Sequence, residues 1–378
     1  MSNTLLASMT TGSFQDGYKE EEEDLRPCCD WDFHLSAVVS NSDSSSDAIG
    51  AIDFSSSSPR LLATAGIARK IRIYSAAALL VPTDDDSPPR HVSSSCDLCI
   101  CAPAKLSSVR FRPDAAGRVV GCGDYDGVVA EYDVERYGAP LLERDEHAGR
   151  RVWDIDYSSP AAASHGHLAA SASDDRTAQL WDSRTCETVA VVRFSGAVCC
   201  VEFDPLGGPW LALGGADRNA YVYDVRKMGR GHVWEMEGHA RAVTYVRFAG
   251  EGGRVVTSAA DGTHRLWEPG TGRQVREYAG HVSGRSFVGM GVWRGGGLIA
   301  SGSESNEVFV YDLRWGEPIW VRGFDGVSCG GDEKGFVSAV CWSQKKEEGE
   351  EMDGVLVAGG SDGVLQIFVC KRKEMDLD

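Results

Sequence analysis

The chain has 378 residues, of which 42% are apolar and 44 are glycine, and its formal net charge is −18 at pH 7. This length allows two ordinary domains or one large all-β domain, and the many glycines favour short strands joined by tight turns. A chain this acidic is a poor partner for phosphate backbones, so we expect no nucleic-acid partner. No run of 18 apolar residues and no signal peptide is found in the sequence, which predicts an intracellular protein with no membrane association.

Residues 1–29 are predicted to form a disordered acidic tail, because they are polar, aperiodic and carry the acidic run Glu20–Asp24. In an intracellular protein the twelve cysteines are expected to be free thiols. Cys96, Cys99 and Cys101, with His91 nearby, offer three or four metal ligands. A structural zinc site usually draws its ligands from two separated pairs, and no second pair follows. We therefore favour a simple thiol cluster and expect no metal or cofactor.

From residue 30 onward the chain repeats. Five strands end in an aromatic residue that follows an aspartate by six positions, as in Asp175 and Trp181, and two further copies lack the aspartate. The anchors Tyr132, Trp181, Tyr223, Trp267 and Tyr311 lie 49, 42, 44 and 44 residues apart. A period of 40–45 residues with Trp-Asp endings is typical of a β-propeller built from WD40 repeats. We therefore predict an all-β, seven-bladed propeller over residues 30–372, with a C-terminal tail at 373–378.

The repeated aspartates are interpreted as structural. In WD40 blades the aspartate sits in the turn between the second and third strands. There it joins a histidine, a serine or threonine, and the tryptophan in one hydrogen-bonded network that satisfies buried polar groups. The expected sets are His147, Ser171, Asp175 and Trp181 in blade three, and His239, Thr257, Asp261 and Trp267 in blade five. Blades one and six have Ala68 and Ser305 in place of the aspartate, so we expect looser turns there.

Ring closure also follows from the pattern. The last repeat supplies only three strands, and residues 30–39 (DWDFHLSAVV) form a strand that belongs to no other blade. Pairing that strand with blade seven closes the ring and removes an open edge. Two insertions, at 75–104 and 344–354, are polar and are predicted to be exposed loops.

Several motifs carry a more specific resemblance. The stretches ATAGIARKIRIY (63–74), GDYDGVVAEYD (123–133), DEHAGRRVWDIDYS (145–158) and GHARAVTYVRF (238–248) resemble the propellers of the plant constitutive-photomorphogenesis ubiquitin ligase and its suppressor-of-phytochrome partners. The RING finger and coiled coil of that ligase are missing. A nearly bare propeller with AKLSSVRF (104–111), RWGEPIWV (314–321) and GGSDGVLQIFV (359–369) is most similar to the plant repressors of UV-B photomorphogenesis. That family implies binding to the UV-B photoreceptor, return of its active monomer to the inactive dimer, and repression of UV-B signalling, in the nucleus and cytoplasm.

The resemblance also implies a binding site. In the related ligase a Val-Pro peptide docks on one face of the propeller, against aromatic side chains surrounded by cations. The matching positions here are Lys105, Tyr125, Arg151, Trp153, Arg241 and Phe287, with Lys105, Arg151 and Arg241 expected as a polar rim. Gly284 stands where the ligase carries an acidic residue. The alternative is that Trp153 and Phe287 are ordinary core residues.

The stretch LWDSR (180–184) fits the WD-x-R box of substrate receptors that dock on the adaptor of cullin–RING ubiquitin ligases. Trp181, Asp182 and Arg184 are its key residues. The alternative is a surface salt bridge, which is worth about 0–1 kcal/mol.

No GxSxG, Walker loop or pair of metal dyads appears, so we expect no enzyme. The rival function is that of a substrate receptor which sends light-signalling transcription factors to ubiquitination. The constitutive-photomorphogenesis ligase is a further expected partner.

Overall fold

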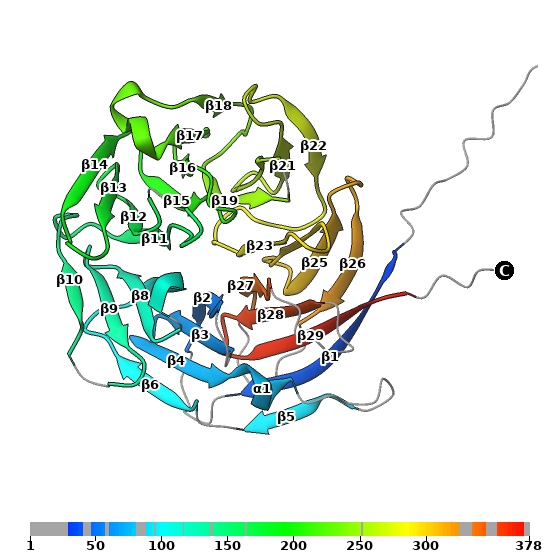
Figure 1. Ribbon diagram of the computed structural model, residues 1–378. Helices are drawn as coiled ribbons and strands as arrows, with labels where there is room; N and C mark the ends of the chain where they lie inside the picture. The colour runs from blue at the N-terminus through cyan, green and yellow to red at the C-terminus, as the bar shows by residue number, and fades with distance from the viewer. Residues whose placement is uncertain are drawn as a thin grey trace, which may run out of the picture.

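The computed structural model describes residues 29–373, except for 41–46, 57–59, 81–87, 94–95, 116, 137–138, 163–164, 251, 325–334 and 345–353. Over these residues the chain forms seven sheets that stand around a central channel, as predicted (Figure 1). The predicted tails at 1–29 and 373–378 lie almost wholly outside the described residues, as does most of the predicted loop at 344–354.

Six blades have four strands each, with the first strand innermost. Blade one contains β2 (Ile49–Phe54), β3 (Leu61–Gly66), β4 (Lys70–Ser75) and β6 (Leu98–Cys101). Blade two contains β7 (Leu106–Phe111), β8 (Val119–Asp124), β9 (Val129–Asp133) and β10 (Leu142–Arg144). Blade three contains β11 (Val152–Tyr157), β12 (Leu168–Ser173), β13 (Thr177–Asp182) and β14 (Thr188–Arg193).

The next three blades continue the pattern. Blade four contains β15 (Val198–Phe203), β16 (Trp210–Gly215), β17 (Ala220–Asp224) and β18 (Trp234–Met236). Blade five contains β19 (Val243–Ala249), β20 (Arg254–Ala259), β21 (His264–Trp267) and β22 (Gln274–Tyr278). Blade six contains β23 (Met290–Trp293), β24 (Leu298–Ser301), β25 (Glu307–Asp312) and β26 (Pro318–Gly323). Two short 3-10 segments, Pro113–Ala115 and Val225–Arg230, lie in connections.

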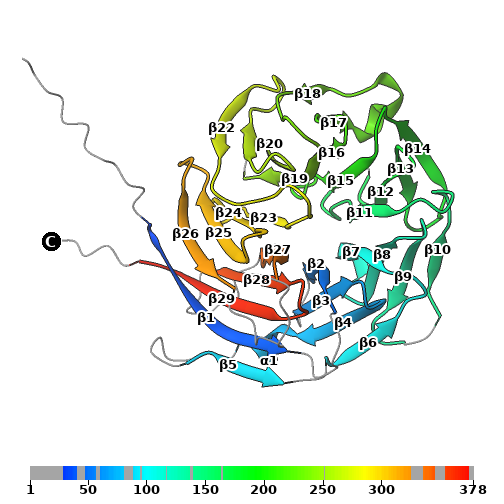
Figure 2. The ribbon, with the colours of Figure 1, turned by 180° about the vertical axis from the view of Figure 1, so that it is seen from behind.

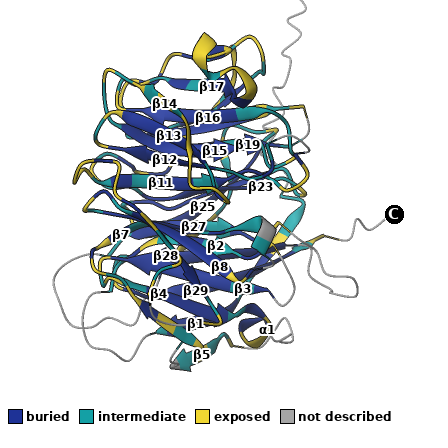
Figure 3. Cartoon of the chain, turned by 60° about the vertical axis from the view of Figure 1, so that its left-hand side comes forward, coloured by how far each residue is buried: buried dark blue, intermediate teal, exposed yellow. Residues whose placement is uncertain are grey.

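The pattern of buried and exposed residues in each strand depends on the position of that strand in its blade. Second and third strands are covered on both sides by neighbouring blades, so they read as nearly continuous buried runs, as in β12 and β13. Outer strands are covered on one side only, and β14 is largely exposed. Figure 3 shows the result: buried residues fill the stacked strands, and exposed residues gather in the loops. The hydrophobic core therefore lies between the blades rather than in one central mass.

Blade seven closes the ring as predicted. It contains β27 (Val337–Trp342), β28 (Gly354–Gly360) and β29 (Leu365–Arg372), and the N-terminal β1 (Trp31–Ser40) pairs antiparallel with β29. Figure 2 shows the first and last strands, β1 and β29, side by side in this blade. Arg314 of blade six lies 2.8 Å from the Asp30 carboxylate and Phe33 stacks on Trp320 at 4.8 Å, which ties the closing strand to the neighbouring blade.

Two expectations about loops were wrong. The insertion at 75–104 is not simply an exposed loop, because it contains the helical turn α1 (Ala76–Leu79), the outer strand β6 of blade one, and β5 (Arg90–Ser93), which pairs in parallel with β1. The turns of blades one and six are not looser than the others. The amides of Arg69 and Asn306 donate to the carbonyls of Gly66 and Ser303 at 3.3 and 3.2 Å, the same closing bond that Arg176 makes in blade three.

Candidate functional site

Trp153 owes its orientation to a β-bulge. The pairing of β11 with β12 shifts register between Val152 and Asp154, so Trp153 has no partner in the ladder. A bulge re-aims one side chain while its neighbours keep their places. Val152 and Ile155 are buried in the core, whereas Trp153 is half-buried and lines the mouth of the central channel. Trp153 is therefore not an ordinary core residue, which was the alternative interpretation.

Four of the predicted peptide-site residues form one stack at this mouth, which we call the aromatic column (Tyr125, Arg151, Trp153 and Phe287). The guanidinium carbon of Arg151 lies 3.8 Å from the ring centroid of Tyr125 and 4.4 Å from that of Trp153. The ring of Phe287 stacks on Trp153 at 4.4 Å with an interplanar angle of 19°. Tyr245 of β19 meets Phe287 edge-on at 5.9 Å. The column joins blades two, three and six across the ring.

The column lies at what we call the upper face, where the turns between second and third strands meet the connections between blades. Tyr125 occupies the turn between β8 and β9, and Arg151 precedes β11. The column lines a cavity of about 950 Å³ that continues into the channel. Aromatic rings held in such a stack lose little entropy when a ligand binds, which is the property expected of a binding hot spot.

The expected polar rim is only partly present. Arg151 was predicted to be a rim charge, and this is wrong, because its guanidinium is sandwiched between two aromatic rings. Arg241 is exposed and donates to the carbonyl of Gly284 at 3.1 Å. Lys105 is exposed, and its backbone carbonyl accepts from the amide of Tyr125 at 2.9 Å. Lys105 and Arg241 border the cavity mouth without lining it.

Sequence analysis missed two carboxylates that hold the column. The indole Nε1 of Trp153 donates to Asp174 at 2.6 Å. Glu304 accepts the amides of Gly284, Arg285 and Ser286 at 3.0, 2.6 and 2.7 Å, and these residues lead directly into Phe287. Burial acts to raise the pKa of Glu304, but the three amide donors outweigh it and lower that pKa below its ordinary value.

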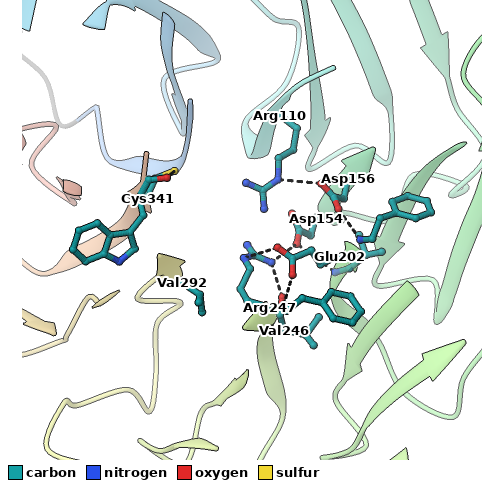
Figure 4. A network of polar contacts seen from close by, with 12 residues as sticks. Arg110, Asp154, Asp156, Glu202, Val246, Arg247, Val292 and Cys341 are labelled. Carbon is teal, nitrogen blue, oxygen red and sulfur yellow. Dashed lines mark hydrogen bonds and ion pairs between the residues drawn. The ribbon is translucent and has the colours of Figure 1, made fainter. Parts of the chain in front are cut away.

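Below the column the channel carries a network of ion pairs that sequence analysis also missed (Figure 4). Arg110 of β7 lies 3.3 Å from Asp53 and 3.7 Å from Asp156. These charges come from innermost strands of different blades, so they hold the blades together around the channel. Burial raises the pKa of Asp156 to about 7, with Arg110 acting against it.

The second cation of this network is Arg247 of β19. It lies 3.7 Å from Asp154 of β11 and 3.9 Å from Glu202 of β15. The side chains of Asp156 and Glu202 also accept the amides of Phe203 and Phe248, respectively, in the next blade of the ring. Blade three is thus joined to blade four, and blade four to blade five, by a carboxylate, which is a structural use of the buried charges.

The blade-five network is complete. His239 donates from Nδ1 to Asp261 at 3.0 Å and pairs through Nε2 with Thr257 at 2.7 Å. The indole of Trp267 donates to Thr257 at 2.8 Å. The buried histidine therefore has partners on both ring nitrogens, as the repeat pattern predicts.

Blade three keeps three of its four predicted members. His147 pairs with Asp175 at 2.9 Å and with Ser171 at 2.8 Å. The indole Nε1 of Trp181 has no hydrogen-bond partner within the described chain, so its inclusion in the network was wrong. The ring of Trp181 instead packs under the guanidinium of Arg144, whose carbon lies 4.9 Å from the ring centroid.

The WD-x-R box lies at the opposite end of the blade from the column, in the turn between β13 and β14. Arg184 donates to both oxygens of Asp182, at 3.3 and 3.1 Å, and its side chain remains 59% exposed. The pairs Asp224–Arg226 and Asp312–Arg314 repeat this geometry in other blades. The local ion pair accounts for the motif structurally and leaves the guanidinium accessible.

The cysteine cluster lies at the outer strand of blade one. Cys99 and Cys101 belong to β6 and are exposed, and Cys96 precedes the strand. Burial raises the pKa of Cys96 and of Cys99, which disfavours the thiolates that bind metals. In the part of the chain that the structure covers, no group of three potential metal ligands comes together and no helix is long and apolar enough to cross a membrane.

The seven-bladed ring and the histidine–aspartate networks of its blades are those of a WD40-repeat protein, a class that serves mainly in protein–protein interaction. The family model "WD domain, G-beta repeat" matches residues 138–182 and 231–268. The chain is 51% identical over 350 residues to the WD repeat-containing protein RUP1 of Arabidopsis thaliana, which covers 92% of this chain and 86% of that protein. It is 52% identical over 340 residues to RUP2 of the same plant, covering 87% and 89%.

The chain therefore belongs to the RUP1 and RUP2 family of WD-repeat proteins. The E3 ubiquitin-protein ligase COP1 of Pisum sativum is 30% identical over 314 residues, which covers 82% of this chain and 43% of the ligase. These relatives support a WD40 protein of light signalling.

Proposed function

We propose that this protein binds the UV-B photoreceptor, promotes return of its active monomer to the inactive dimer, and so represses UV-B signalling without catalysing any reaction. The observation that carries the proposal is the aromatic column, because it gathers Tyr125, Arg151, Trp153 and Phe287 at one accessible mouth. The identity to RUP1 and RUP2 supports the same role.

In this proposal a Val-Pro segment of the photoreceptor contacts the column. Arg151 and Phe287 each lie 4.4 Å from the Trp153 ring within the column, and Trp153 and Phe287 are only half-buried, so parts of both aromatic side chains stay exposed at the mouth for an apolar ligand. The valine and proline therefore contact Trp153 and Phe287. Lys105 and Arg241 lie at the border of the mouth, where they meet acidic residues that flank the pair.

Binding can speed dimer formation in two ways. The propeller holds the monomer in a state ready to associate, or it displaces a COP1-type ligase from the same peptide. Neither route needs a nucleotide, metal or other cofactor. The proposed sites of action are the nucleus and cytoplasm, which imaging of a fluorescent fusion tests directly.

The test is the rate at which purified photoreceptor monomers form dimers. We expect a faster rate with the wild-type propeller and no acceleration with Trp153→Ala, which removes the centre of the column. Truncation of a hot-spot residue costs about 2–4 kcal/mol, or roughly 30- to 1000-fold in affinity. Arg184→Ala is the matched control, because it changes an exposed residue at the opposite face. Equal rates with and without the wild-type protein contradict the proposal.

A second candidate is a substrate receptor of a cullin–RING ubiquitin ligase, favoured by the exposed guanidinium of Arg184. Its face is separate from the column, so the two functions are compatible. In this case purified adaptor is captured by the wild type and not by Arg184→Ala. Recovery of the photoreceptor from plant extract only after UV-B exposure favours the first function, and light-independent recovery of transcription factors favours the second.

A further inference from the structure

In blades one, two, three and six the same position of the repeat places a side chain next to the channel mouth. It is the residue immediately before the network aspartate or its substitute, in the turn between the second and third strands. Tyr125 occupies this position in blade two and Ile67 in blade one, and both line the cavity. In blades three and six the same position holds Asp174 and Glu304.

Asp174 makes one hydrogen bond to the indole of Trp153 and one to the backbone that precedes it. Its carboxylate accepts the indole N–H at 2.6 Å, and its backbone amide donates to the carbonyl of Arg151 at 2.9 Å. Trp153 projects from a bulge and has no partner of its own in the strand ladder. The carboxylate therefore supplies the directional contact that sets the ring plane facing Arg151 and Phe287.

Glu304 has the corresponding role for Phe287, the other aromatic residue of the column that faces Trp153. Three consecutive amides converge on its carboxylate oxygen, which gathers the segment Gly284–Ser286 into a tight curve. Arg241 donates to the carbonyl of Gly284 from the other side at 3.1 Å. Phe287 follows directly, so the direction of its ring depends on this curve.

We propose that Asp174 and Glu304 are positioning residues that orient Trp153 and Phe287 for binding of an acidic, Val-Pro-containing peptide. The proposal rests on the proposed function for its ligand. Both residues are negative at a face that would receive acidic flanks, so their charges alone oppose binding. The positioning by these residues is therefore expected to strengthen peptide binding, and their negative charge to weaken it. Substitutions can separate the two effects.

The first experiment titrates a synthetic peptide with Val-Pro between glutamates. Asp174→Ala removes the indole acceptor, and the loss of one such hydrogen bond is expected to weaken binding about 3- to 10-fold. Asp174→Asn keeps an acceptor and removes the charge, so it should bind as tightly as the wild type or more tightly. If Asp174 acted by charge alone, both variants would bind more tightly.

A double-mutant cycle tests whether Asp174 acts through the indole. In a Trp153→Phe background there is no indole N–H, so Asp174→Ala should cause no further weakening. The same loss in both backgrounds overturns the proposal for Asp174. Glu304→Ala is expected to weaken binding at least as much as Asp174→Ala does, and wild-type affinity of a folded Glu304→Ala protein overturns the proposal for Glu304.

A measurement made without peptide distinguishes failure of this inference from failure of the proposed function. In protein labelled with 5-fluorotryptophan, the resonance that disappears in Trp153→Phe reports on this ring. Asp174→Ala and Glu304→Ala should shift or broaden that resonance, whereas Asp174→Asn should leave it near its original position. An unchanged resonance in both alanine variants overturns the inference. A clear shift with no peptide binding by the wild type refutes only the proposed ligand.

Discussion

Replacing Asp261 with alanine removes the acceptor of four hydrogen bonds in blade five. The carboxylate accepts from Nδ1 of His239, from the amide of Ala240, and from both the amide and hydroxyl of Thr263, at 2.8–3.1 Å. The side chain of His239 is 1% exposed, so water cannot easily replace its lost partner. The other donors lie nearer the surface, where water can replace the carboxylate.

The expected loss of stability is about 2–3 kcal/mol. A hydrogen bond to a charged acceptor is worth about 1.5–3 kcal/mol, and the water-accessible donors add little. Burial acts to raise the pKa of Asp261, but the hydrogen bonds outweigh it and hold the pKa well below 3.8. A folded-state pKa below the unfolded value means that this stabilisation is present above pH 4 and is lost as the pH falls further. The difference between wild type and variant should therefore shrink in acid.

Urea denaturation at pH 7, followed by tryptophan fluorescence, measures the loss. Asp126→Ala is the matched control, because Asp126 occupies the same repeat position in blade two but is exposed, and its carboxylate has no partner among the residues covered by the structure. Its substitution should change stability by less than about 0.5 kcal/mol. Equal shifts in the denaturation midpoint for the two variants would refute the network as the cause.

Three further predictions concern closure, the column and acid stability. Deleting residues 31–40 exposes the edge of β29 and should broaden and lower the melting transition, whereas deleting residues 1–28 leaves every described strand in place and should not; equal melting temperatures contradict this. Arg151→Ala removes a layer of the column, so its loss of peptide affinity should persist from low to high salt, and a loss confined to low salt restores the rim interpretation. Burial lowers the pKa of His281 to about 4 from 6.5, so protonation favours unfolding and stability should fall by up to about 3 kcal/mol between pH 6.5 and 4. His281→Gln should flatten that slope, and an unchanged slope contradicts the assignment.

The sequence was sufficient to predict the ring and its closure. The spacing between the turn position and the aromatic residue repeats because the second and third strands of each blade are joined by the same kind of tight turn, with or without the aspartate. The strand at 31–40 was predictable because an unpaired edge in blade seven is costly, and this segment alone had no other partner. Both predictions depend on backbone pairing, which leaves a periodic trace in the sequence.

The outer strand of blade one, β6, was not predicted, because its sequence shows no periodic pattern. In β6 only Ile100 is buried, because an outer strand is covered on one side, and four residues are too few to show alternation. The looser turns expected at Ala68 and Ser305 failed for a related reason. Arg69 and Asn306 adopt the left-handed conformation that closes each turn, with φ near 60°, so the aspartate is not needed for the turn itself.

Contacts across the ring are the hardest feature to predict, because they join residues that are unrelated by the repeat. Trp153 and Phe287 are 134 positions apart, and only the resemblance placed them at one site. The two aspartates that follow β12 have different roles, which the repeat pattern alone does not reveal. Asp175 turns into the blade to hold His147, while Asp174 turns to the channel mouth to hold Trp153. The repeat pattern identifies Asp175 as the aspartate that stabilises the blade. The adjacent position 174 is not part of that network, so its side chain can vary with the ligand.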